Sequence, residues 1–242
     1  EPNGIMTVQT HDDPLLPGDP SFTVRSDWPF GAQEHLPQMN AEESWHTSQG
    51  AGVTVAVVDT GIDLDHPDLN GNIKPGTTIM RGSTKLGQDD HGHGTHVAGI
   101  IAAEINNLAD RAAQANGNTA WNGGTVGVAP HAKIMPVKVL SSGGSGSWAD
   151  VAKGIDYAAN NGANIINMSL GGGFSDTVSA AILNAYSKGV LVISAAGNGN
   201  AEGSSHPASD LYSLSIAAVD KYDVRASFSN YGATTVDLAA PG

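Results

Sequence analysis

Three histidines lie close together in the segment DDHGHGTHVAGI, at His91, His93 and His96. An imidazole can bind a transition metal, act as a general base near neutral pH, or stand as an ordinary residue at a helix terminus. A zinc site is the weakest of these interpretations, because the chain has no HExxH pattern and no cysteine to complete a structural site. The choice between one catalytic base and three bystanders depends on which distant residues approach the cluster.

The composition narrows the options. The chain has 242 residues, of which 40% are hydrophobic and 14% charged, so it is long enough to bury a sizeable core. The absence of cysteine excludes a thiol nucleophile and disulfides, and the net charge of −13 argues against a nucleic-acid partner. No apolar run approaches the roughly 20 residues of a membrane span. Because no basic, apolar leader precedes Glu1, we expect a secretory signal to be absent or already removed.

Five apolar runs, rich in β-branched residues, predict the strands of a parallel sheet that is covered on both faces. They are GVTVAVVDTG, KIMPVKVL, ANIINMSL, GVLVISAAG and SLSIAAV. Pro136 indicates an edge or a bulge in the second run. Helical spacing starts at Trp148 and at Val178, a short helix is expected near Ala41 to Trp45, and the Ala- and Gly-rich stretch from His96 to Ile105 predicts a buried helix. The alternation predicts an α/β fold, with a doubly wound, mostly parallel sheet and helices on both faces.

Polar residues follow three of the predicted strands. In a doubly wound fold, ligands bind at the carboxyl ends of the strands. Asp59 follows the first strand, and Ser169 and Asn198 follow two others, while His93 opens a helix. We therefore expect these groups to meet at one rim of the sheet.

The stretches VVDTGI, HGTHVAG and ISAAGNGN, which contain Asp59, His93 and Asn198, resemble the Asp, His and oxyanion-Asn motifs of the subtilisin-like serine proteases. The resemblance is to the thermitase-like branch and runs from about Pro17 to Gly242. Further matching blocks occur in order: PGDPSF, GIDLDHPDLNG, GVAPHAKIMPVKVL, GSGSWADVAKGIDYAANNGANIINMSLGG, SFSNYG and VDLAAPG. The resemblance implies a subtilisin-like fold, with an N-terminal arm at 1–18 and a peptidase domain at 19–242. It also implies a secreted endopeptidase that acts on polypeptides.

The resemblance gives each motif a role. His93 would be the base that activates a serine hydroxyl, Asp59 would orient the imidazole, and Asn198 would donate to the oxyanion. His91 and His96 would have no chemical role. An extended peptide would pair with two backbone segments and fill a side-chain pocket; these comprise Gly144, Ser145 and Gly146, then Ser169, Leu170 and Gly171, and for the pocket Ala195, Ala196 and Gly197.

A structural calcium site is implied by the same resemblance. Asp19 and Asp68 match two of its ligands, and such an ion would attach the N-terminal arm to the domain. The third part of the family's site departs from the pattern, because the stretch from Leu108 to Thr119 is longer than the usual loop.

The nucleophile is the main departure from the family. In the family, the nucleophilic serine lies in a Gly-Thr-Ser-Met-type turn beyond the APG motif, and this sequence ends at APG. Its candidate serines, Ser169, Ser227 and Ser229, stand in other motifs. We therefore expect the carboxyl-terminal part of the fold to be missing, a remainder of the protein to carry the serine, and this chain alone to be inactive. Alternatives are a non-catalytic scaffold and a nucleotide-binding domain, but no G-x-G-x-x-G follows the first strand.

Overall fold

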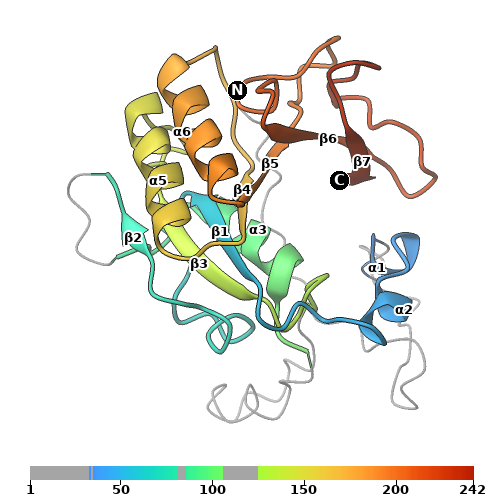
Figure 1. Ribbon diagram of the computed structural model, residues 1–242. Coiled ribbons are helices and arrows are strands. Elements are labelled where there is room, and N and C mark those ends of the chain that lie inside the picture. The colour runs from blue at the N-terminus through green and yellow to red at the C-terminus, as the bar shows by residue number, and fades with distance from the viewer. Residues whose placement is uncertain (1–32, 34, 81–85, 106–124) are drawn as a thin grey trace.

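A seven-stranded sheet forms the centre of the computed structural model, which describes residues 33, 35–80, 86–105 and 125–242 (Figure 1). The strand order is β2-β3-β1-β4-β5-β6-β7, and every neighbouring pair is parallel. The strands are β1 (Thr54–Asp59), β2 (Thr77–Thr78), β3 (Lys133–Lys138), β4 (Ile165–Met168), β5 (Leu191–Ala195), β6 (Ser213–Val219) and β7 (Leu238–Pro241). All five predicted strands are therefore present.

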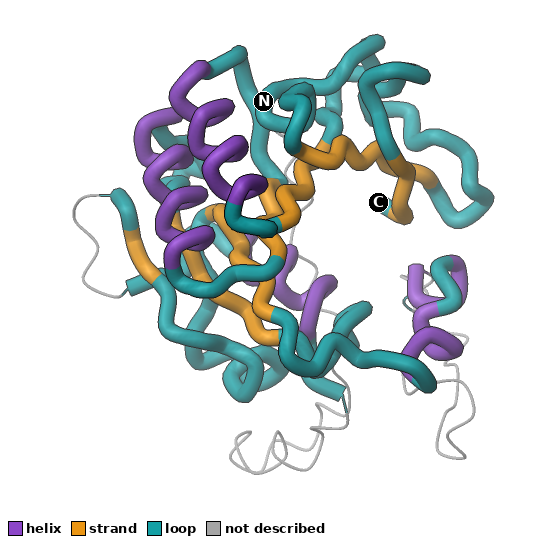
Figure 2. Tube along the Cα trace, viewed as in Figure 1, coloured by secondary structure: helices purple, strands orange, loops and turns teal. Residues whose placement is uncertain are grey.

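Helices cover both faces of this sheet. In the described residues the helices are α1 (His35–Gln38), α2 (Ala41–Trp45), α3 (His93–Ala102), α5 (Trp148–Asn160) and α6 (Asp176–Ser187). Of these, α3, α5 and α6 pack on the sheet. Helices α5 and α6 lie side by side on one face, and α3 lies on the other (Figures 1 and 2). The prediction of a doubly wound α/β fold is confirmed.

Strand β1 shows why its sequence is apolar without alternation. All six of its residues are buried. Ala56 and Val58 join the cluster beneath α5 and α6, whereas Val55 and Val57 join the cluster that contains Ala98 of α3. Because successive side chains point to opposite faces and both faces are covered, neither side of the strand needs polar residues.

Helix α5 follows from capping and spacing. The hydroxyl of Ser147 accepts a hydrogen bond from the Asp150 N–H at 3.1 Å, which satisfies one of the free donors of the first turn. The buried face comprises Val151, Ala152, Gly154, Ile155 and Ala158. Gly154 is required for the close approach to the sheet, since a Cβ there would lie 2.6 Å from Cγ1 of Val139.

Helix α3 differs from its prediction. It begins at His93 and ends at Ala102, and its buried residues are Gly94, Ala98 and Ala102. The predicted buried helix over His96–Ile105 is therefore present with other bounds and is buried on one side alone, since Ile100 is 39% exposed. The apolar residues around α3 have two different surroundings, because one side packs on the sheet and the other lines a pocket.

Short or irregular elements escaped the sequence analysis. Strands β2 and β7 and helix α1 contain two to four residues and have no recognisable period. Pro136 lies in β3 opposite the short outer segment that includes β2, where pairing runs through Ile134 and then resumes at Val137. Its missing N–H thus falls at an interruption of the outer ladder, as a position near an edge requires.

The N-terminal segment packs through α1 and α2. Leu36 and Ala41 form a small cluster with Val126, and the indole N–H of Trp45 donates to the Val128 carbonyl at 2.8 Å. The arm predicted at 1–18 and the insertion at 108–119 lie outside the described residues. Among the residues that the structure describes, no helix is long and apolar enough to cross a membrane.

The topology fixes where a site can form. From β1 the chain passes through α3 to β3 on one side, and then crosses through α5 to β4 on the other side of β1. The winding direction therefore reverses at β1. The carboxyl ends of β1 and β4 border the crevice in which doubly wound folds bind ligands.

Candidate active site

Asp59 ends β1 at this reversal point, and its side chain is fully buried. Its Oδ1 accepts from the Thr60 N–H at 2.6 Å and lies 2.7 Å from Nδ1 of His93. Its backbone carbonyl accepts from Val139 at 2.9 Å and Leu140 at 3.1 Å. The carboxylate is therefore fixed by its own strand and faces a single imidazole.

His93 is the first residue of α3, and 18% of its side chain is exposed. The hydrogen bond to Asp59 raises the pKa of His93, and the negative charges of Asp59 and Asp89 add to this, while burial acts in the opposite direction. Because a carboxylate can only accept, Nδ1 carries the proton, and the lone pair of the neutral ring is on Nε2. His93 also lines a pocket, so its ring lies between the buried carboxylate of Asp59 and the pocket.

Thr60 connects the two segments that carry Asp59 and His93. Its N–H donates to Asp59, its hydroxyl donates to Oδ1 of Asp89 at 2.9 Å, and the hydroxyl also accepts from the Gly94 N–H at 2.9 Å. Thr60 is 1% exposed. These bonds set the distance between the end of β1 and the start of α3.

Asp89 supplies the capping that α3 otherwise lacks, since Gly92 at the N-cap has no side chain. The carboxylate of Asp89 accepts from the backbone N–H groups of His91, Gly92 and Thr95 at 2.9, 3.0 and 3.1 Å, and from the Thr95 hydroxyl at 2.5 Å. Burial raises the pKa of Asp89, but the hydrogen bonds from Thr95, Gly92 and His91 outweigh burial, so the pKa lies below its usual value. Asp89 thus remains ionised at the helix N-terminus, where a negative charge is favourable.

His91 and His96 have different surroundings: His91 lies against His93, and His96 lines the pocket. His91 accepts the backbone N–H of His93 at its Nδ1, and the two rings meet edge to face with centroids 6.3 Å apart. Burial and the nearby His93 lower the pKa of His96. Within the described ranges, no group of three His, Asp or Glu side chains is arranged to hold a metal ion.

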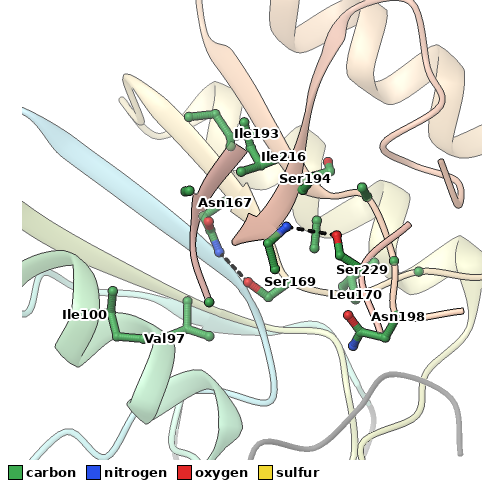
Figure 3. Close-up of a pocket in the computed structure, with 18 of the residues that line it drawn as sticks. Val97, Ile100, Asn167, Ser169, Leu170, Ile193, Ser194, Asn198, Ile216 and Ser229 are labelled. Atoms are coloured by element: carbon green, nitrogen blue, oxygen red, sulfur yellow. Dashed lines mark hydrogen bonds between the residues drawn. The ribbon is translucent and has the colours of Figure 1, made fainter. Parts of the chain in front are cut away.

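The pocket beside His93 is lined largely by apolar side chains from α3, β4, β5 and β6 (Figure 3). Val97 and Ile100 contribute from α3, and Ile193 and Ile216 from the sheet. Seven residues named from the sequence line the same pocket: Ser169, Leu170, Gly171, Ala195, Ala196, Gly197 and Asn198. The structure therefore brings together His93, the segment after β4 and the segment after β5.

The third predicted substrate segment lies in a turn after β3. Gly144 donates to the Ser141 carbonyl, and Ser141 donates to the Ser145 carbonyl, both at 2.9 Å. A Cβ on Gly144 would lie 3.2 Å from Nε2 of His91. Gly146 approaches the backbone carbonyl of Val139 closely. The structure places this turn beside His91 rather than among the residues that line the pocket.

Of the two predicted calcium ligands, the structure describes Asp68 alone. Asp19 lies outside the described residues. Asp68 is buried at 6% exposure, and its Oδ2 accepts from the Thr125 N–H at 3.3 Å. Its backbone carbonyl accepts from Glu104 at 2.7 Å. Asp68 does not line the pocket.

Two asparagines that the sequence analysis did not assign support the pocket wall. Asn230 donates to the Ala196 carbonyl at 3.1 Å and accepts from Gly199 at 2.8 Å, so it holds the loop that carries Asn198. The amide of Asn167 donates to the Ser169 hydroxyl at 3.1 Å (Figure 3). Both residues stand in motifs that resemble the family, SFSNYG and NIINMSLGG, but their partners depend on the fold.

Comparison with known proteins identifies the family. Residues 50–242 match the family model described as "Subtilase family", which covers most of the chain and includes Asp59, His93 and Asn198. The chain belongs to the subtilase family. Thermitase from Thermoactinomyces vulgaris is 38% identical over 227 residues, which are 93% of this chain and 73% of that relative. Subtilisin Savinase from Lederbergia lenta is 44% identical over 194 residues, which are 80% of this chain and 65% of that relative.

A solved structure supports the same assignment. The crystal structure of a cold adapted subtilisin-like serine proteinase superposes with a TM-score of 0.67 at 35% identity, over 81% of this chain and 64% of that chain. Among other relatives, the chain spans 46% of an alkaline protease from Alkalihalobacillus alcalophilus, so this subtilase sequence corresponds to about half of some relatives. The subtilisin-like fold predicted from the motifs is confirmed.

Proposed function

We propose that the protein is a secreted serine endopeptidase of broad specificity that hydrolyses polypeptides. The observation that carries this proposal is the 2.7 Å contact between the buried carboxylate of Asp59 and Nδ1 of His93, beside an apolar pocket. Membership of the subtilase family supports it. A non-catalytic scaffold would not require an imidazole held in one tautomer beside an open pocket.

His93 is the general base in this proposal. Neutral Nε2 takes the proton of a serine hydroxyl as the oxygen attacks the peptide carbonyl, and later returns it to the leaving amine. Asp59 keeps the proton on Nδ1 and stabilises the imidazolium that forms in between. The raised pKa of His93 fits this role, because a base works best when its pKa lies near the working pH.

Asn198 is the proposed oxyanion donor. It follows β5 at the rim of the pocket, where its amide can donate to the oxygen on which negative charge develops. The backbone around it is constrained, since Asn230 holds the neighbouring loop and Gly197 has a φ of 115°, in the left-handed region that favours glycine. Loss of the donor in a subtilisin lowers turnover on the order of 10²- to 10³-fold, and we expect the same for Asn198→Ala.

The substrate is proposed to bind as an added strand between two backbone segments, 144–146 and 169–171, with a side chain directed toward 195–197. The support is that the second and third of these segments line the pocket with His93. Ala195, Ala196 and Gly197 are small, which leaves room for a large apolar side chain.

The nucleophile is proposed to lie on a remainder of the protein outside these 242 residues. Within the described part of the chain, the hydrogen bonds of His93 run to Asp59 and His91 and none runs to a serine. Ser169 lines the pocket, but its hydroxyl accepts from Asn167. The apolar pocket extends from His93 to Gly242 and offers a surface for the remainder to cover.

Calcium is proposed as a structural ion near Asp68. A buried carboxylate suits a hard cation, which prefers oxygen ligands, and burial of Asp68 at 6% exposure fits that chemistry. The described residues alone do not supply a set of three acidic or histidine ligands, so further ligands such as Asp19 would have to come from elsewhere in the chain. The ion would stabilise the fold and take no part in bond cleavage.

Two variants and one probe test the proposal. His93→Ala in the full-length protein should lower peptide hydrolysis by several orders of magnitude at an unchanged melting temperature, whereas the control His91→Ala should remain close to wild type. A fluorophosphonate should label the full-length protein once and leave the 242-residue chain unlabelled. Equal losses in both histidine variants, or stoichiometric labelling of a serine within the 242 residues, would contradict the assignment.

A further inference from the structure

Lys138 is a lysine in the interior of the fold. It is the last residue of β3, pairs in register with Asp59, and is 3% exposed. Lysine is almost never buried to this degree unless it is paired, because an ammonium ion without partners loses its hydration at a high free-energy cost. The burial of Lys138 beside the candidate site therefore implies partners that stabilise its charge.

Three oxygen atoms surround its ammonium group. Nζ donates to the Thr60 carbonyl at 2.5 Å, to Oδ1 of Asp90 at 2.6 Å and to the Leu140 carbonyl at 2.8 Å. An ammonium has three donors, so all of them are satisfied. Of these three oxygens, the one of Asp90 is charged, and the side chain of Asp90 is 54% exposed.

Each of these oxygens belongs to a different part of the candidate site. Thr60 follows Asp59 and binds its carboxylate through the backbone N–H. Asp90 lies in the loop that leads to His93. Leu140 begins the segment that leads to the turn at 144–146, which is the proposed binding strand for the substrate. One side chain thus joins the chain segments that lead to the acid, to the base and to the proposed substrate strand.

We propose that Lys138 is the positioning residue that holds Asp59, His93 and the 140–146 segment at their working distances. This inference rests on the proposed function, because it concerns the geometry of that reaction. Lys138 acts through Thr60, Asp90 and Leu140, and it does not touch the reacting atoms. A role confined to general stability would not require that all three contacts lead into the site.

The same strand provides a matched control. Lys133 starts β3 and also ties backbone segments together, since its Nζ donates to the Gly71 carbonyl at 2.8 Å and to Oδ1 of Asn72 at 3.0 Å. Its contacts lie at the amino end of the sheet, away from the pocket. Lys133→Met removes two lysine hydrogen bonds from the same strand without disturbing the site, so it controls for the loss of a lysine in β3.

The test compares Lys138→Met with Lys133→Met in the full-length protein. We expect Lys138→Met to lower kcat/KM on a peptide substrate by about 10- to 100-fold, mainly through kcat, because small displacements of catalytic groups have effects of this size. Lys133→Met should stay within about twofold of wild type, as a site away from the chemistry does. Where Lys138→Met fails to fold, Lys138→Gln replaces it; this side chain is one atom shorter and keeps two N–H donors, and it should show a smaller loss in the same direction.

The pKa of His93, measured by NMR on labelled imidazole, separates positioning from simple charge removal. The charged or titratable groups around His93 are Asp59 from β1, Asp89 and His91 from the preceding loop, and His96 from α3. Loss of a nearby positive charge alone would raise the pKa of His93. Loosening of the Asp59 contact would lower it, and we expect a fall of about 0.5 to 1, a fraction of what a close opposite charge contributes.

The outcomes are distinct. A lower kcat/KM together with a lower His93 pKa in the Lys138 variant, with neither change in Lys133→Met, supports the inference. An unchanged or raised pKa, unchanged kcat/KM, or equal losses in both lysine variants overturns it. If the wild-type protein does not hydrolyse peptides, the proposed function fails, and the His93 titration still decides whether Lys138 positions the pair.

Discussion

Replacement of Asp89 by asparagine should destabilise the protein, and the loss can be worked out from individual atoms. Oδ1 of Asp89 accepts from Thr60, His91 and Gly92, and the amide oxygen of asparagine can take over these three bonds. Oδ2 accepts from the N–H and the hydroxyl of Thr95, and an amide NH₂ cannot accept from either.

The expected magnitude is about 2 to 3 kcal/mol. A hydrogen bond to a charged group contributes about 1.5–3 kcal/mol, and a negative charge at a helix N-terminus about 0.3–1 kcal/mol. Part of the first contribution is recovered when the amide donates to the Thr95 hydroxyl. For a protein of this size, about 2 to 4 °C of melting temperature corresponds to each kcal/mol, so the melting temperature of Asp89→Asn should fall by roughly 4 to 12 °C.

The pH dependence has a defined sign. The pKa of Asp89 in the folded state lies below its usual value, so the unfolded state binds protons more readily in acid. The contribution of the carboxylate is therefore complete above the unfolded pKa of about 3.9 and declines as the pH falls through the folded pKa. The difference in unfolding free energy between wild type and Asp89→Asn should stay constant from pH 5 to 8 and shrink near pH 3.

Urea denaturation at pH 7 and at pH 3, with proteolysis blocked by a serine-directed inhibitor, measures this difference. Asp220→Asn is the control, because Oδ1 of Asp220 alone accepts from Tyr222 and Val224 in an exposed turn and an asparagine can replace it. Its effect should stay below about 0.5 kcal/mol. A difference for Asp89→Asn that is equally small, or that is the same at both pH values, would refute the reasoning.

Three further predictions follow from the site. The kcat/KM of the full-length protein should rise with pH through a midpoint above 6.5, the ordinary histidine value, because the base must be neutral and Asp59 raises the pKa of His93; in Asp59→Asn an NMR titration should give a lower His93 pKa. A chelator should lower the melting temperature, and Asp68→Asn should reproduce most of that drop, whereas a melting curve indifferent to chelator would exclude a stabilising calcium ion there. Gly94→Ala should lower the free energy of unfolding by about 1–3 kcal/mol and should lower activity. The reason is that a Cβ on residue 94 would clash with the Gly61 carbonyl and push α3 away from β1. Calorimetry that shows wild-type stability would contradict this close approach.

The main strands could be predicted from the sequence because a sheet covered on both faces favours apolar residues without alternation, as at positions 55–58 of β1. Strands β2 and β7 could not, since two to four residues paired at the edge carry no such pattern. The exposure of Ile100 could not be predicted from the sequence for a related reason. An apolar side chain that faces a pocket has the same sequence pattern as one that faces the core.

In the candidate site too, some residues could be predicted from the sequence and others could not. Asp59, His93 and Asn198 could be named from ordered motifs, and the structure brings His93 into contact with Asp59 and places Asn198 on the same pocket. Thr60 and Lys138 carried no signal of their own, because the hydrogen bond between them joins residues 78 positions apart. Asp89 was not assigned either, although its contacts with the start of α3 are local. The role of Lys138 in holding the site depends on the register of β1 and β3, which no local pattern specifies.

The position of β1 in the interior of the sheet has a consequence for how the chain is made. Its neighbour β4 pairs with it in register, for example at Ile165 and Val55. The Thr54 N–H also donates to Oδ1 of Asn164, 110 positions further along the chain. At a synthesis rate of about 5–20 residues per second, the two strands appear roughly 5 to 20 s apart. Throughout that interval one edge of β1, which is apolar at positions 55–58, has no partner. Parallel pairings of such separation also form slowly once both strands exist. During synthesis this edge of β1 therefore stays open to pairing with other chains for several seconds, which favours aggregation.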